Sequence, residues 1–253
     1  MGRTVAFIQA RMASTRLPNK ILKKMNGISV VEHLISRLKK SLLIDDIVVL
    51  TSTNIENQPL CDVLYEKGIP FFRGSENDVL ERFYLANQHY QADNIVRLTA
   101  DSPFICSEII DELIEEFNQK DAQYAYLSER FAEGVDCEII KATTLNEVAK
   151  KAERASEREH VTLYIFNNLE EFNVIELQNE TDDSGYRFTL DTLDDWQVIK
   201  KVAEYFSDNS TKVTYQDIKL YFDTHPDVFL INNHEIRNEG LAISLLKEQE
   251  KYD

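Results

Sequence analysis

The chain has few cysteines and histidines, and their spacing limits what it can be. Its three cysteines (Cys61, Cys106 and Cys137) are far apart and lack metal-ligand spacing. We therefore expect free thiols in a reducing compartment rather than a disulfide framework. The five histidines form no H-x-x-x-H or His/Cys set, which argues against a zinc site.

Long apolar runs are also missing. No stretch is long enough to span a bilayer, and the first apolar run is too short for a secretory signal and is followed by Arg11. We expect a cytoplasmic protein that does not contact membranes. Seven glycines, five prolines and no low-complexity linker leave no clean domain boundary in 253 residues. That length can bury a sizeable core in one large domain or two small ones.

Positive charge is scarce but unevenly placed. The formal net charge is −16, which argues against a general nucleic-acid binder. Up to Lys40, however, the only acidic residue is Glu32, whereas lysine and arginine recur throughout that segment. An acidic protein with one basic loop suits a small polyanion that brings its own divalent metal.

This basic loop follows the first predicted strand. The apolar run 5–8 is typical of a buried strand, and small, hydroxyl and cationic residues come directly after it. The fork-shaped guanidinium of arginine and the compact charge of lysine both suit phosphate groups. The location also fits, because ligands of open α/β sheets bind beyond the carboxyl ends of the strands. An ordinary basic turn is the alternative. The candidate contacts are Ala10, Arg11, Ser14, Arg16 and Lys20.

The pattern that follows alternates strands and helices. Strands are predicted at 46–51, 69–72, 94–99, 124–127, 172–177 and 186–190, with an alternating edge strand within 133–140. Helices are predicted at 28–40, 60–67, 107–119, 143–151, 194–206, 214–222 and 233–252, with a further helix start after residue 75 and a turn through 224–227. This order predicts a three-layer α/β/α fold with a mostly parallel, mixed sheet and a helical C-terminal tail.

Two aspartates follow predicted strands. Asp101 comes after the strand 94–99, and Asp191 comes after the strand 186–190. Strand-end carboxylates in such a sheet face the same crevice as the basic loop. A helix-capping turn is the alternative for Asp101, whereas Thr192 is the expected cap of the helix after Asp191.

Several motifs together resemble one enzyme family. The segment 10–20 is similar to the A-R-x-x-S-x-R-L-P-x-K signature of the cytidylyltransferases that include the KDO and acylneuraminate enzymes, especially the branch named for spore coat polysaccharide biosynthesis protein F. Residues 72–84 resemble its F-R-G-S and D-V-L-x-R-[FY] signature, and residues 97–103 its R-[IL]-T-[GA]-D-x-P. Further matches are G-[LV]-D-x-E at 134–138, R-E-H-V-T at 158–162, D-T-x-[ED]-D at 191–195 and a tail H-x-x-R-N-E-G at 234–240. Asn19 stands where the family usually has glycine, but asparagine tolerates a left-handed conformation.

The resemblance implies a Rossmann-like nucleotidyltransferase. Its α/β domain would span residues 1–206, with a helical extension at 207–253 packed on it or on a partner subunit; a homodimer is one possible assembly. It implies an Mg²⁺-dependent transferase that activates a sugar or sugar acid with CTP for cell-surface polysaccharide or glycan biosynthesis. Arg11, Lys20 and Asp101 would be catalytic, and Asp101 and Asp191 would hold the metal. The other implied nucleotide contacts are Arg73, Gly74, Ser75 and Thr99, and the implied acceptor-side residues are Asp136, Glu138, Arg158, Glu159 and His160.

Other interpretations stay open at this point. The chain could use another nucleoside triphosphate, because backbone contacts that read a base are invisible in sequence. It could also be a nucleotide-binding assembly or regulatory subunit without catalysis. The sequence does not rank the acceptors.

Overall fold

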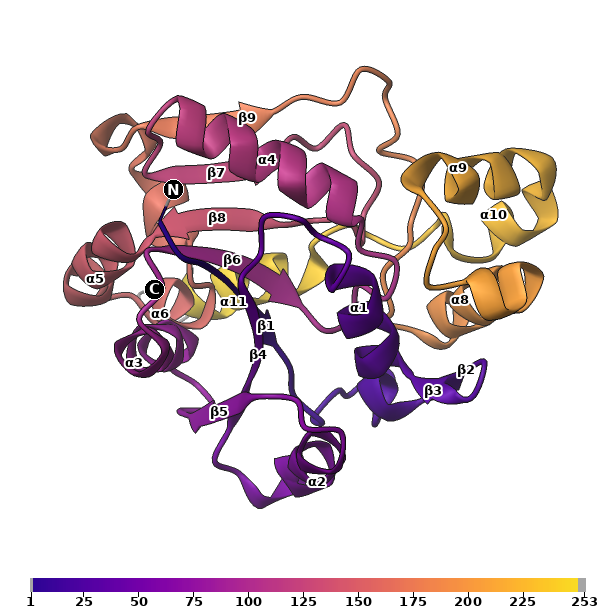
Figure 1. Ribbon diagram of the computed structural model, residues 1–253, viewed down its shortest axis with the longest axis horizontal. Helices are drawn as coiled ribbons and strands as arrows, with labels where there is room; N and C mark the ends of the chain where they lie inside the picture. Colours follow the sequence, from indigo (N-terminus) through magenta and orange to yellow (C-terminus); the bar gives the residue numbers. More distant parts are fainter. Residues whose placement is uncertain (1, 250–253) are drawn as a thin grey trace.

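A computed structural model describes residues 2–249, and its centre is a seven-stranded sheet in the order β5-β4-β1-β6-β8-β7-β9 (Figure 1). The strands are β1 (Thr4–Gln9), β4 (Asp46–Ser52), β5 (Phe71–Gly74), β6 (Asn94–Thr99), β7 (Tyr124–Leu127), β8 (Glu138–Lys141) and β9 (Val174–Leu177). A short hairpin pairs β2 (Lys24–Met25) with β3 (Ile28–Ser29) outside this sheet.

The first half of the sheet is parallel. β1 lies between β4 and β6, and β5 pairs with the outer side of β4. The chain thus runs outward from β1 in one direction and then returns to the other side of β1. This reversal places the loops after β1 and β6 next to each other, which is where ligands bind in open α/β sheets.

The second half is mixed. Within the described residues β8 alone runs against its neighbours, since it is antiparallel to both β6 and β7, and β9 is parallel to β7. The prediction of an edge strand within 133–140 was therefore wrong. Acidic and apolar residues alternate here because Glu138 is paired inside the sheet with Arg97 of β6.

Helices cover both faces of the sheet. One apolar cluster joins β-strand residues such as Ile8 and Leu98 to α1, α2, α4, α8 and α9; another joins Phe7 and Ile95 to α3, α5 and α7. The three-layer prediction is confirmed. The helices are α1 (Val30–Leu38), α2 (Gln58–Glu66), α3 (Val79–Tyr90), α4 (Ser107–Gln119), α5 (Ala142–Lys151), α6 (Ala155–Glu159), α7 (Leu163–Asn167), α8 (Leu193–Phe206), α9 (Tyr215–Thr224), α10 (Pro226–Asn232) and α11 (Glu239–Gln249).

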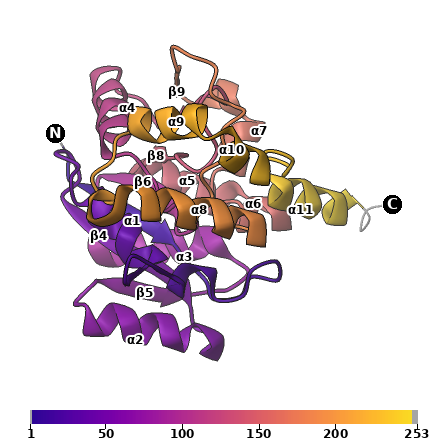
Figure 2. The same cartoon turned by 90° about the vertical axis from the view of Figure 1, so that its right-hand side faces the viewer.

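The C-terminal helices follow one another along one side of the molecule (Figure 2). The predicted turn through 224–227 is reduced to His225, which lies between the last residue of α9, Thr224, and the first of α10, Pro226. Proline can occupy the first turn of a helix. The predicted helix 233–252 is shorter in the structure, starting at Glu239, and its last three residues lie outside the described part of the chain. Among the helices of residues 2–249, none combines the length and apolar character needed to cross a bilayer.

The predicted strand 186–190 is not a strand. Arg187 makes only an isolated bridge with Glu133, and the backbone N–H of Leu190 donates instead to the carbonyl of Asp101 at 2.8 Å. The segment is extended, but its hydrogen-bond partners belong to two different loops. A regular ladder therefore does not form.

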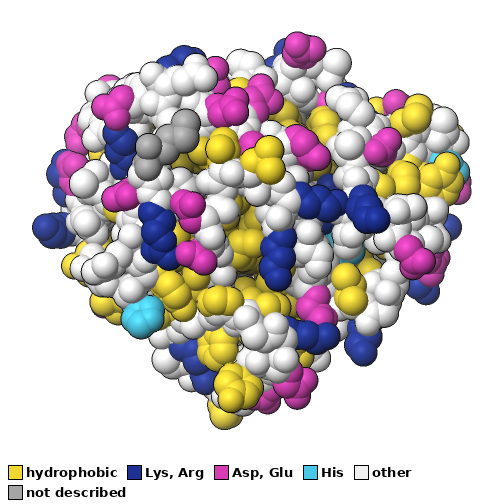
Figure 3. Space-filling model, in the orientation of Figure 1, with side chains coloured by type: hydrophobic (Ala, Val, Ile, Leu, Met, Phe, Trp, Pro, Cys, Tyr) yellow, Lys and Arg dark blue, Asp and Glu magenta, His cyan; other side chains and the backbone are white. Residues whose placement is uncertain are grey.

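Acidic and basic side chains are interspersed over the face shown in Figure 3. An anion would therefore be attracted by local clusters of side chains rather than by this face as a whole.

Candidate active site

The loop after β1 is shaped by its own small residues. The backbone N–H of Ala10 donates to the carbonyl of Leu50, and Ser14 Oγ accepts a hydrogen bond from the backbone N–H of Leu17 at 3.3 Å. Asn19 has φ +58°, the left-handed conformation that asparagine tolerates. The turn at Asn19 starts a short 3-10 helix, Lys20–Leu22, and places the side chain of Lys20 inside the protein.

Lys20 links the two predicted strand-end carboxylates. Its Nζ lies 2.7 Å from Asp101 Oδ2 and 2.7 Å from Asp191 Oδ1. Burial opposes the charged form of Lys20, but the two carboxylates outweigh it and raise the pKa of the ammonium group. Likewise, burial opposes ionisation of Asp101, but the neighbouring Lys20 outweighs it and lowers the pKa of that carboxyl. Lys20 and Asp101 are therefore both charged at neutral pH.

Backbone contacts bring the two aspartates together. The carbonyl of Asp101 accepts hydrogen bonds from the N–H of Leu190 at 2.8 Å and from Thr189 Oγ1 at 3.2 Å. Because Leu190 directly precedes Asp191, this contact holds one loop against the other. Oxygen atoms of two carboxylates thus converge on one point, where the Lys20 ammonium now lies. Carboxylate oxygens are also the ligands that a divalent ion such as Mg²⁺ prefers, so the same two aspartates fit such an ion.

A buried support, which sequence reasoning missed, lies behind Asp191. Asp195 is fully buried and accepts hydrogen bonds from Arg187 Nε at 2.8 Å and Nη2 at 3.0 Å. It also accepts from the backbone N–H of Asp191 at 2.8 Å and of Thr192 at 3.0 Å, and from Asn232 Nδ2 at 2.9 Å. Arg187 in turn pairs with Glu133. Asp195 looks like an ordinary helix-start residue, so only the structure identifies it as the support of this turn.

Two more cations of the loop lie close by. Arg16 Nη2 is 3.3 Å from Asp191 Oδ2, and its Nη1 contacts Glu239 of the C-terminal segment. Arg11 is half exposed, and its Nη1 is 3.9 Å from Glu76 Oε1. The structure therefore brings Arg16, Lys20, Asp101 and Asp191 into one cluster, with Arg11 beside the neighbouring loop after β5.

At the end of β5 and in the loop after it, Arg73 and Ser75 form internal contacts. Arg73 donates to the carbonyls of residues 52–54 at 3.1 Å each and to Gln58 Oε1 at 3.0 Å. Ser75 Oγ accepts from the backbone N–H of Asp78, and its carbonyl accepts from the buried Arg82. A Cβ at Gly74 would lie 2.9 Å from Arg82 Cγ, so glycine permits this close packing. Thr99 Oγ1 is 3.4 Å from Ser102 Oγ, at the edge of the aspartate cluster.

Glu138 belongs to a buried polar network on the sheet. It pairs with Arg97 and accepts hydrogen bonds from Tyr124 Oη and from Thr162 Oγ1, the latter at 2.7 Å. Burial opposes its ionisation, but Arg97 outweighs burial and lowers the pKa of Glu138. Arg97 also lies close enough to Asp101 for that carboxylate to help raise the pKa of Arg97 against burial. The network therefore adjoins the aspartate cluster.

The other acceptor-side candidates are spread around this network. Asp136 Oδ1 accepts from Arg237 Nη2 at 2.8 Å, and Glu159 accepts from Ser244 Oγ at 3.1 Å. Arg158 joins α6 to the start of α3, with its Nη2 2.6 Å from Asp78 Oδ2. Burial lowers the pKa of His160, whose Nε2 is buried and makes no hydrogen bond among the described residues.

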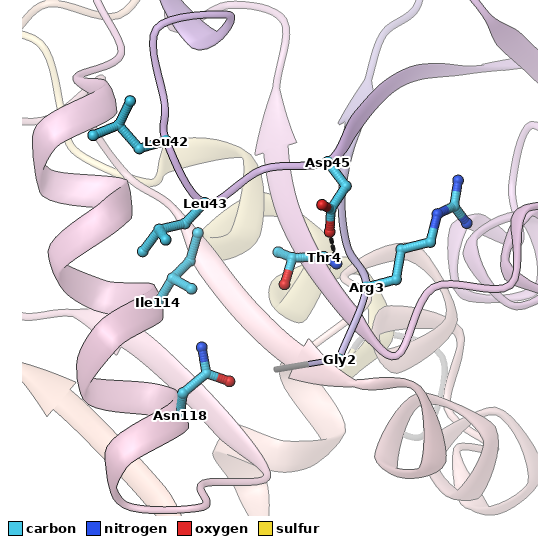
Figure 4. Close-up of a pocket in the computed structure, with 8 residues that line it drawn as sticks. All are labelled: Gly2, Arg3, Thr4, Leu42, Leu43, Asp45, Ile114 and Asn118. Atoms are coloured by element: carbon cyan, nitrogen blue, oxygen red, sulfur yellow. Dashed lines mark hydrogen bonds between the residues drawn. The ribbon is translucent and has the colours of Figure 1, made fainter.

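A shallow pocket of about 450 Å³ lies at the opposite end of β1 (Figure 4). Leu42, Leu43 and Ile114 form its apolar side, and the backbone N–H of Thr4 donates to Asp45 Oδ2 at 2.7 Å. None of the predicted site residues lines this pocket. The cluster at the carboxyl ends of the strands is therefore the candidate active site.

Comparisons with known proteins identify relatives of this chain. A sequence model of the family described as cytidylyltransferase matches residues 5–195. An uncharacterised protein of Methanocaldococcus jannaschii is 34% identical over 234 residues, 92% of this chain and 95% of that protein. Spore coat polysaccharide biosynthesis protein SpsF of Bacillus subtilis is 32% identical over 211 residues, 81% of this chain and 88% of its own length.

Solved structures share the fold. A cytidylyltransferase from Leptospira borgpetersenii superposes with a TM-score of 0.86 at 33% identity, over 94% of this chain and all of that one. A CMP:2-keto-3-deoxy-manno-octonic acid synthetase, solved in complex with CTP, has a TM-score of 0.61 at 16% identity and covers 82% of this chain and 99% of its own. The second likeness concerns the fold alone.

Proposed function

Because the chain belongs to the cytidylyltransferase family and is a nucleotidyltransferase, we propose that it couples CTP to a sugar or sugar acid with Mg²⁺ and releases pyrophosphate. The observation that carries the proposal is the Lys20 ammonium between Asp101 and Asp191, with Arg16 beside them. The relationship to SpsF supports a role in polysaccharide or glycan biosynthesis.

In the proposed reaction, a hydroxyl or phosphate oxygen of the acceptor attacks the α-phosphorus of CTP. The bond from that phosphorus to the bridging oxygen breaks, and pyrophosphate leaves with the electron pair. Such displacements are accelerated mainly by positioning and by neutralising charge on phosphoryl oxygens. The cations of the loop after β1 supply that neutralisation.

Each residue of the cluster has a part in this scheme. Lys20 has three N–H donors, two of which already point to carboxylates, so one remains for a phosphate oxygen. Arg11 and Arg16 hold the triphosphate as fork-shaped donors. Asp101 and Asp191 would hold Mg²⁺, which when bound neutralises charge on phosphate oxygens.

The acceptor would lie over β6 and β8. Asp136 and Glu159 offer carboxylates to sugar hydroxyls there, and His160 is a candidate base because its lowered pKa keeps the imidazole neutral at pH 7. Glu138 holds Arg97 in place, so we assign it to shaping the pocket.

The test is pyrophosphate release with Mg²⁺, in which CTP, UTP, GTP and ATP are each combined with acidic sugars and sugar phosphates. Release with CTP and one acceptor class is the expected result. CTP binding without release across the panel would favour a non-catalytic nucleotide-binding subunit. Release with a different nucleotide would overturn the choice of CTP, and absence of nucleotide binding would overturn the proposal.

A further inference from the structure

The C-terminal segment crosses the candidate active site. It is fastened at one end by Arg237, whose Nη1 donates to the carbonyls of Glu129 and Phe131 at 3.0 and 2.9 Å. At the other end Glu248 accepts a hydrogen bond from Ser156 Oγ at 2.6 Å. Between these contacts Glu239 begins α11 and reaches the loop after β1.

Glu239 contacts a cation that the proposed function assigns to the nucleotide. Its Oε2 lies 2.5 Å from Arg16 Nη1, and the two side chains are 37% and 38% exposed. The other arm of the Arg16 guanidinium faces Asp191. Arg16 thus lies between two carboxylates. A phosphate group that binds Arg16 must displace one of these carboxylates or bind next to them.

We propose that Glu239 is an autoinhibitory residue: its carboxylate occupies Arg16 until the triphosphate displaces it. The inference rests on the proposed function. An exposed ion pair contributes little free energy, so the multiple charges of a triphosphate can outcompete one carboxylate. A nucleotide that lacks the β- and γ-phosphates does not compete with Glu239, and its binding is not affected by it.

The helix that carries Glu239 is suited to being released. Ile243 and Leu246 of α11 are 43% and 61% exposed, so burial of apolar surface holds the helix only weakly. Its described attachments include the polar contacts of Glu239, of Ser244 with Glu159, and of Glu248 with Ser156. Loss of the contact at Glu239 therefore loosens the start of α11 when the triphosphate binds.

The experiment compares full-length wild-type protein with Glu239→Gln by calorimetric titration with Mg²⁺-CTP, pyrophosphate and CMP. We expect Glu239→Gln to bind CTP and pyrophosphate about fivefold more tightly and CMP equally well. Glu248→Gln is the matched control, because it makes the same change at the far end of α11 and should leave all three affinities unchanged. Hydrogen exchange in α11 should rise when CTP binds to the wild type.

Several outcomes would overturn the inference. Weaker CTP binding by Glu239→Gln would mean that Glu239 orients Arg16 for the nucleotide, and unchanged binding would mean that it does not compete. Equal tightening in Glu248→Gln would point to a general effect of charge. If the wild type binds CTP in these cases, the proposed function survives. If the wild type binds neither CTP nor pyrophosphate, both proposals fail.

Discussion

Lys20 Nζ lies 2.7 Å from Asp191 Oδ1, although the two residues are 171 positions apart in the chain. The contact joins the loop after the first strand to the turn before α8. It forms because Asp101, which lies between them in sequence, binds Lys20 by its side chain and the segment before Asp191 by its carbonyl. One aspartate thus organises both sides of the site.

Substitution of Lys20 or Asp101 should abolish most of the activity. Lys20→Ala removes a phosphate-neutralising charge and leaves two carboxylates facing each other without their shared cation. We expect kcat for pyrophosphate release to fall by about 10²-fold or more, as for Asp101→Asn, which is the scale for loss of one electrostatic contact. Lys24→Ala, at an exposed position of the hairpin, is the matched control. Near-wild-type turnover in either variant would remove that residue from the mechanism.

Asp195→Asn should damage both stability and activity. The change removes the buried negative charge that accepts two hydrogen bonds from Arg187. We expect a loss of about 3 kcal/mol in unfolding free energy, measured by urea denaturation, because breaking a buried ion pair leaves its partner uncompensated. Asp194→Asn changes the adjacent, partly exposed residue and should stay within about 0.5 kcal/mol of the wild type. Equal effects of the two substitutions would contradict a supporting role for Asp195.

Gly134→Ala should be strongly destabilising. Gly134 has φ +99°, and an added Cβ would lie 2.4 Å from the backbone nitrogen of Thr189. Because backbone atoms cannot turn away as a side chain would, we expect a loss of at least about 2 kcal/mol and a Tm lower by about 5 °C. Gly185→Ala is the control, since an added Cβ there meets no atom within 4 Å. A Tm for Gly134→Ala equal to that of the control would argue against this close approach.

His33 should make stability fall in mild acid. It is fully buried, with Nδ1 2.9 Å from the carbonyl of Pro103, and burial lowers its pKa from 6.5 to about 4. Between those two values the unfolded chain binds a proton that the folded protein does not. The contribution of neutral His33 to the free energy of unfolding is therefore fully present above pH 6.5 and declines as the pH falls toward 4.

The size of this effect can be measured. From pH 7 to pH 5, His33 should account for a loss of about 2 kcal/mol in unfolding free energy. His33→Gln should be less stable than the wild type at pH 7 but should lose less stability on acidification, as measured by urea denaturation at both pH values. The same loss in both proteins would show that other groups dominate the acid sensitivity.

Local sequence patterns were sufficient for much of the fold. The predicted strands 94–99 and 124–127 and the helix 107–119 coincide with β6, β7 and α4, because each has a clear periodicity. The extended segment 186–190 misled the prediction, since alternation shows that a segment is half buried but not which partner it pairs with. Its partners proved to be two separate loops.

In the site, too, local patterns identified suitable residues but not their partners in space. The cations after β1 and the strand-end aspartates were visible as residue types in suitable places. Arg97, Arg187 and Asp195 were not, because their roles depend on which strands and turns are neighbours in space. The contact between Glu239 and Arg16 depends on the path of the C-terminal helices, which no local pattern records.

The order in which the parts of the sheet occur in the chain also has a consequence for synthesis on the ribosome. The parallel strands β1, β4, β5 and β6 are complete at Thr99, whereas Asp191 is added many residues later. At usual translation rates the 171 residues between Lys20 and Asp191 take roughly 10 to 30 s to add. We expect the parallel half to form first and the ammonium of Lys20 to have Asp101 as its carboxylate partner before Asp191 emerges.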